Sequence, residues 1–76
     1  AKAEVDLHIE KLLEGHENMN AADIMKLQLD TFEKELDLAV AHNQSQIIFI
    51  HGIGNGILKN ELHRRLGKHP HVASFS

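Results

Sequence analysis

Apolar residues in the first half of the chain follow two different periods. Over residues 3–9 they alternate with polar residues, which is typical of a half-buried strand. Over residues 21–42 they recur every three or four positions and predict a helix with one apolar stripe: Met25, Leu29, Phe32, Leu36, Ala39 and Val40. Asn20 is a suitable N-cap for this helix, and Asn43 a suitable left-handed terminator. Residues 10–20, which contain Gly15, are expected to form a loop that can include one helical turn at residues 12–13.

The second half contains an unbroken apolar run. Residues 47–50 read Ile-Ile-Phe-Ile and predict a strand over 46–51 that is buried on both faces. A glycine loop at 52–56 leads into a predicted helix over 57–66, with Gly67 as its end. Pro70 prevents a helix beyond that point, and residues 72–75 predict a last short strand.

The order strand–helix–strand–helix–strand predicts an α/β fold. We expect a single small layer, with a mixed sheet of three to four strands, two helices and right-handed crossovers. All 76 residues belong to one domain, because a chain this short builds one core. The predicted core residues are Met25, Leu29, Phe32, Leu36, Ile48, Ile50, Leu58 and Leu62.

Composition narrows the class of protein. The chain has no cysteine, which excludes a disulfide framework and a thiolate zinc site and fits a reducing, cytoplasmic location. No apolar run is long enough for a membrane span, so no membrane partner is expected. Residues 38–76 carry one acid, Glu61, against four bases: Lys59, Arg64, Arg65 and Lys68. These bases suit a phosphate-bearing partner, although the net charge of −3 argues against strong non-specific binding.

The glycine loop follows His51 at the end of a predicted strand. Glycines allow close backbone approach, and free amides at a helix start attract anions. The loop lacks the spacing of a dinucleotide fingerprint and the Gly-Lys-Ser/Thr of a phosphate-binding P-loop. The alternative is a plain turn that needs positive φ.

Asp6 and His8 are expected on one face of the first strand. Ligands of α/β sheets gather at the carboxyl ends of strands, so this pair and His51 should meet there, on one face with the glycines and with the loop amides turned outward. An imidazole oriented by a carboxylate can act as general acid or base on a phosphate ester. The alternative is that these are surface histidines bonded to loop carbonyls.

Two motifs resemble those of the small MutS-related (Smr) domain. Residues 5–8, Val-Asp-Leu-His, are similar to its L-D-x-H-G motif, and residues 48–58 to its strand followed by H-G-x-G-x-G-x-L/I-R. Within the family the chain looks most like the version attached to bacterial multidomain proteins of Bacteroides type. The resemblance implies four strands and two helices, similar to the C-terminal domain of a translation initiation factor and to part of the DNase I fold.

Smr domains bind DNA or RNA, and several cleave it. The resemblance therefore implies catalytic roles for Asp6, His8 and His51. It implies nucleic-acid contacts for His51, Gly52, Gly54, Gly56 and Lys59, and the charge pattern adds Arg64 and Arg65. Three departures are present: Ile9 replaces a glycine, residues 10–20 are longer than in compact members, and the chain ends at Ser76, before the family's final strand.

Two functional hypotheses follow. The first is a nucleic-acid-binding domain with DNA or RNA nicking endonuclease activity, serving DNA mismatch repair, recombination or RNA quality control; cleavage would imply a divalent cation as cofactor. The second is a non-catalytic interaction module that contacts other domains of a larger parent protein. A third reading, metal binding through His63, His69 and His71, is weakly supported because surface histidines explain it equally well, and no metal ligand is assigned.

Overall fold

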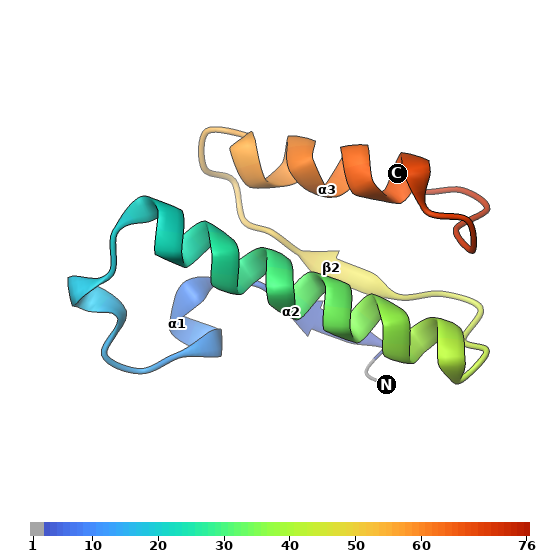
Figure 1. Cartoon of the computed structure of the whole chain (residues 1–76), viewed down its shortest axis with the longest axis horizontal. Helices are drawn as coiled ribbons and strands as arrows, with labels where there is room; N and C mark the ends of the chain where they lie inside the picture. Colours follow the sequence, from blue (N-terminus) through green and yellow to red (C-terminus); the bar gives the residue numbers. More distant parts are fainter. Residues whose placement is uncertain (1–2) are drawn as a thin grey trace.

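The computed structural model describes residues 3–76 and has an α/β fold. Its elements are β1 (Glu4–Asp6), α1 (Ile9–Leu12), the 3₁₀-helix η1 (His16–Asn18), α2 (Ala21–Ala41), β2 (Ile48–Ile50) and α3 (Ile57–Lys68). Figure 1 shows the long helix α2 lying across the two strands, with α3 running beside it. Among residues 3–76, no helix has both the length and the apolar character that crossing a membrane requires.

The sheet has two strands in the described residues, and they are parallel. Glu4 pairs with Ile48, Val5 with Phe49 and Asp6 with Ile50. Beyond the strand, the Leu7 amide donates to the Ile50 carbonyl at 2.8 Å. The expected mixed sheet of three to four strands is therefore wrong in its count and direction over residues 3–76, although the α/β class is confirmed.

The predicted third strand over residues 72–75 does not form. The Val72 amide donates to the His69 carbonyl in a turn at 3.3 Å. Phe75 packs edge-on against the His63 ring, with centroids 5.1 Å apart, and lies close to Gly67. These contacts hold the tail on α3, so its backbone makes no ladder with β2.

The core lies between the sheet and the two longer helices. Its buried cluster is Val5, Leu7, Phe32, Leu36 and Leu62, with Leu29, Phe49 and Leu58 packed against it. Predictions for Phe32, Leu36 and Leu62 are confirmed, whereas Met25 is only half-buried.

Ile48 and Ile50 were predicted in the core, and this is wrong. Ile48 is 47% exposed and Ile50 is half-buried. Their partners in the register are Glu4 and Asp6, so both isoleucines lie on the face of the sheet away from α2. Phe49 takes the core position and contacts Phe32 edge-on at 4.8 Å. Ile48 and Ile50 both remain accessible to solvent, so β2 is not buried on both sides.

Several element ends follow from local chemistry. The Asp23 amide donates to Asn20 Oδ1 at 2.8 Å, which confirms the predicted N-cap of α2. Asn43 has φ of 54°, the left-handed conformation expected of it. The loop predicted over 10–20 instead contains α1 and η1, and α3 continues through Gly67 to Lys68.

Candidate functional site

The end of β1 carries a tightly bonded carboxylate–imidazole pair. Asp6 Oδ1 accepts a hydrogen bond from the His8 backbone amide at 2.9 Å and lies 2.6 Å from His8 Nδ1. These contacts end the strand at Asp6, because the side chain turns the backbone at His8. The amide hydrogen bond first, and the imidazole second, hold the pKa of Asp6 below its usual range. Asp6 is therefore ionised near neutral pH.

The pair fixes the tautomer of His8. An ionised carboxylate only accepts, so the hydrogen between the two side chains belongs to Nδ1 of His8. In the neutral ring, Nε2 then carries the lone pair. The His8 side chain is 39% exposed, so the imidazole is partly accessible to solvent.

Gly52 lies against that imidazole. A Cβ atom added to Gly52 would be only 2.7 Å from His8 Nε2, and the residue has φ of +80°. Glycine is thus required both by the backbone conformation and by the closeness of His8. The parallel register, which pairs Asp6 with Ile50, brings these two motifs together, as the sequence predicted.

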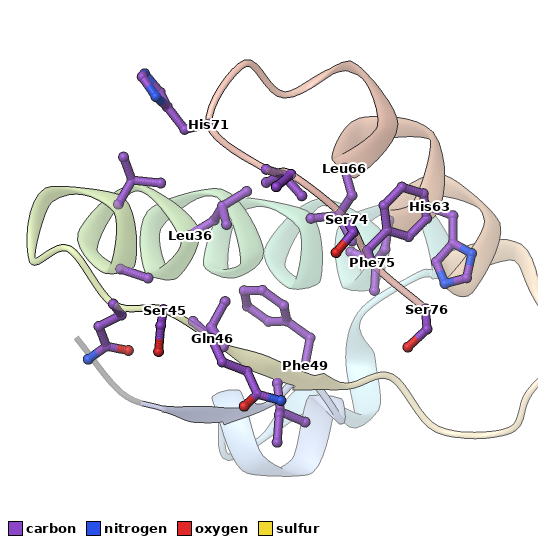
Figure 2. A pocket seen from close by; sticks show the side chains of 18 of the residues that line it. Leu36, Ser45, Gln46, Phe49, His63, Leu66, His71, Ser74, Phe75 and Ser76 are labelled. Atoms are coloured by element: carbon purple, nitrogen blue, oxygen red, sulfur yellow. The ribbon is translucent and has the colours of Figure 1, made fainter.

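His51 does not join this cluster. Its Nδ1 lies 2.6 Å from the Gly52 carbonyl, which can only accept, so the ring donates there through Nδ1. His51 lines a groove of about 760 Å³ beside α3, which neither Asp6 nor His8 lines. Figure 2 shows Phe49 and Gln46 on one side of this groove and His63 and Phe75 on the other. His51 bonds to the Gly52 carbonyl and not to Asp6 or His8, so one shared face for His51 and the Asp6–His8 pair stays a prediction.

The rest of the loop is open. Nothing lies within 4 Å of the Cβ position of Gly54, and Gly56 caps α3 with φ of +83°. Asn55 Oδ1 accepts from the Ile57 amide at 3.1 Å. The loop thus exposes bare backbone between Gly52 and the first turn of α3.

The predicted basic residues differ in availability. Arg64 donates twice to Glu61, and Arg65 donates to Glu61 at 2.8 Å and to Glu33 at 3.1 Å. The two guanidiniums lower the pKa of Glu61 to about 2. Lys59 is exposed and, among the described residues, has no such partner. Arg64 and Arg65 must give up or share these contacts before they can bind a phosphate.

The comparisons with known proteins agree with the two motifs. A family model described as the Smr domain matches residues 5–76. The chain belongs to the Smr domain family. The match includes the Asp6–His8 pair, the glycine loop and the whole of α2 and α3.

Curated relatives of this Smr domain are far longer proteins named Endonuclease MutS2. The one from Streptococcus uberis is 41% identical over 49 residues, covering 64% of this chain and 6% of that protein. The one from Solidesulfovibrio magneticus is 40% identical over 58 residues, covering 71% of this chain and 8% of that protein. No solved structure matches the chain significantly.

Two residues that sequence analysis missed position the Smr cluster. Gln28 of α2 donates its side-chain amide to the Leu7 carbonyl at 3.0 Å and so ties the end of β1 to the helix. Lys11 of α1 is close enough to Asp6 to favour its charged form. The contact of Gln28 spans 21 positions and has no local signal. Lys11 lies on a helix that was expected to be loop.

The described side chains do not form a metal centre. Among residues 3–76, no three histidine, aspartate or glutamate side chains gather in a metal-binding arrangement. Asp6 Oδ1, which would be a ligand, already accepts two hydrogen bonds from His8. What the cluster offers chemically is an oriented imidazole beside open backbone.

Proposed function

We propose that this Smr domain binds DNA or RNA where His8 meets the glycine loop and that it cleaves a phosphodiester bond there. The single observation that carries the proposal is the cluster of Asp6, His8 and Gly52, in which an oriented imidazole lies against bare backbone. The name of the relatives, Endonuclease MutS2, supports the same chemistry.

The proposed step uses His8 as general base. Its Nε2 accepts a proton from a water molecule as the water oxygen bonds to phosphorus, and the bond from phosphorus to the leaving oxygen breaks. The leaving oxygen takes a proton from solvent. The Asp6 carboxylate, 2.6 Å from Nδ1, stabilises the imidazolium that forms. Bare amides near Gly54 and Gly56 would donate to the phosphate oxygens.

Cleavage is tested with supercoiled plasmid and with single-stranded RNA. His8→Ala should reduce the rate by about a hundredfold or more, since that is the usual contribution of a general base. Asp6→Asn should reduce it less, because the imidazole remains. The exposed His71 on the C-terminal turn provides the control, His71→Ala, with an unchanged rate expected. Equal rates for His8→Ala and the unmodified chain would disprove the proposed role of His8.

Binding should be weak and sensitive to salt, because within residues 3–76 Lys59 has no acidic partner, whereas Arg64 and Arg65 are bonded to Glu61. Lys59→Ala should reduce the slope of log affinity against log salt by about 0.9 for duplex DNA. Arg64→Ala should change the slope less, since its guanidinium is bonded to Glu61. Fluorescence anisotropy with single- and double-stranded DNA and RNA measures this.

The parent protein and the cellular process are part of the same proposal. The chain spans only 6–8% of the length of the curated relatives, which favours a domain of a larger parent protein. A role in DNA mismatch repair, recombination or RNA quality control, in the cytoplasm, fits nucleic-acid cleavage. Salt-sensitive binding without cleavage would instead support a nucleic-acid-binding module that lacks catalysis, and no binding at all would support the interaction module.

A further inference from the structure

The tip of the glycine loop carries an unusually exposed apolar side chain. Ile53 is 97% exposed, the highest value among the exposed large apolar residues of the described chain. A single exposed apolar residue needs no explanation by itself. Ile53, however, lies between Gly52, which packs on His8, and Gly54, which has open space around it. Figure 1 shows this loop turning at the N-terminal end of α3.

The backbone fixes where Ile53 lies. Gly52 has φ of +80° and Gly54 has φ of +39°, so the isoleucine stands on a turn that few other sequences adopt. Its branched Cβ restricts the side chain to few rotamers. Little conformational freedom is therefore lost when Ile53 packs against a ligand, which favours binding.

Ile53 is also next to the proposed reaction centre. It follows directly after Gly52, whose Cβ position is 2.7 Å from His8 Nε2. Adjacent Cα atoms are only about 3.8 Å apart. A nucleic-acid backbone placed at His8 would thus bring a sugar or base within reach of Ile53. Ile57, at the start of α3, is also exposed, at 58%.

The apolar character of the Ile53 side chain determines which part of a nucleic acid it can contact. Isoleucine neither donates nor accepts hydrogen bonds, so it cannot read the polar groups of base edges; it can pack on a thymine methyl group or on the apolar face of a base, and the faces offer the larger area. Those faces are covered in an uninterrupted duplex and become available where a base is unpaired or its stack is broken.

We propose that Ile53 is a wedge that packs against an exposed base and gives this Smr domain a preference for nucleic acid with an unpaired base. The inference rests on the proposed function, because it assumes a nucleic-acid backbone at His8. It assigns specificity to Ile53 and leaves the bond-breaking chemistry to Asp6 and His8.

The test compares a short DNA duplex carrying one bulged 2-aminopurine with the same duplex fully paired. The unmodified chain should bind the bulged duplex about tenfold more tightly, as expected for burying part of one isoleucine side chain. The 2-aminopurine fluorescence should change on binding. Ile53→Ser should lose both the preference and the fluorescence change, while Ile53→Leu should keep them. Leu13→Ser, which alters another exposed apolar residue, is the matched control and should behave like the unmodified chain.

The possible results separate a failure of the wedge from a failure of the proposed function. A preference that persists in Ile53→Ser, or is absent from the unmodified chain, overturns the wedge while leaving salt-dependent binding intact. Absence of salt-dependent binding to either duplex overturns the proposed function and the wedge with it. Binding to vesicles of phosphatidylcholine and phosphatidylglycerol that Ile53→Ser abolishes would assign the side chain to a membrane surface and also overturn the wedge.

Discussion

The two faces of the short sheet differ in what covers them. On one face Val5, Leu7 and Phe49 pack with α2 and are shielded from water to different degrees. On the other face Asp6 and His8 are half-exposed, and Ile48 on the same face is exposed. Because side chains alternate along β1, the core and the candidate chemistry come from neighbouring residues. We call the face of Val5, Leu7 and Phe49 the covered face and the face of Asp6 and His8 the open face. Packing on the covered face holds the backbone that positions the side chains of the open face.

The largest expected effect lies on the covered face. Phe32 is fully buried and contacts Phe49, so Phe32→Ala should lower the free energy of unfolding by about 3–5 kcal/mol. Urea denaturation measures this. Leu38→Ala, an exposed position on the same helix, should cost less than about 1 kcal/mol. Equal losses for the two variants would mean that α2 does not present Phe32 to the sheet.

A smaller effect is expected where the open face meets the loop. Gly15 and Gly52 share positive φ, but only Gly52 has a neighbour close to its Cβ position. Gly15→Ala should therefore cost about 1–2 kcal/mol from backbone conformation alone. Gly52→Ala should cost more and should also shift the His8 ring resonances in an NMR spectrum. Equal costs with unchanged His8 resonances would show that His8 does not pack on Gly52.

The smallest expected effect concerns the charge on the open face. The hydrogen bonds from His8 lower the pKa of Asp6 in the folded state, so they stabilise the fold above the ordinary carboxyl pKa of about 3.9. That contribution is lost as the pH falls through the lower, folded value. The free energy of unfolding of Asp6→Asn should thus lie below that of the unmodified chain at neutral pH and approach it in acid. In a His8→Ala background the difference should shrink, and a difference that is constant with pH would contradict the pairing.

The covered face was largely predictable from the sequence. The apolar stripes of α2 and α3 and the alternation along β1 are local patterns. The stripes predict Phe32, Leu36 and Leu62 as core residues. The run at residues 47–50 is apolar at every position and so carries no information about which side faces α2. Only the pairing of Ile48 with Glu4 settles that Phe49 points inward.

The sequence predicts the individual residues of the candidate site better than it predicts which of them lie together. Spacing alone predicts the bond between Glu61 and Arg65, whereas the contact from Arg65 to Glu33 depends on how α2 and α3 pack. The motifs predict that His8 and Gly52 meet, but the direction of His51 is set by the end of β2. The strand predicted over residues 72–75 is wrong because Phe75 packs edge-on against His63, a contact that no sequence pattern indicates.

The parallel pairing of the strands has a consequence for folding. Glu4 and Ile48 are more than forty positions apart, and the whole of α2 separates them. A helix forms from local contacts, but this pairing must close a long loop and is expected late in folding. His8 and Gly52 touch only once it has formed. The Leu7 amide, which bonds to the Ile50 carbonyl, should therefore exchange its hydrogen only when the contact between His8 and Gly52 also opens. Only fully folded molecules would then carry an assembled candidate site.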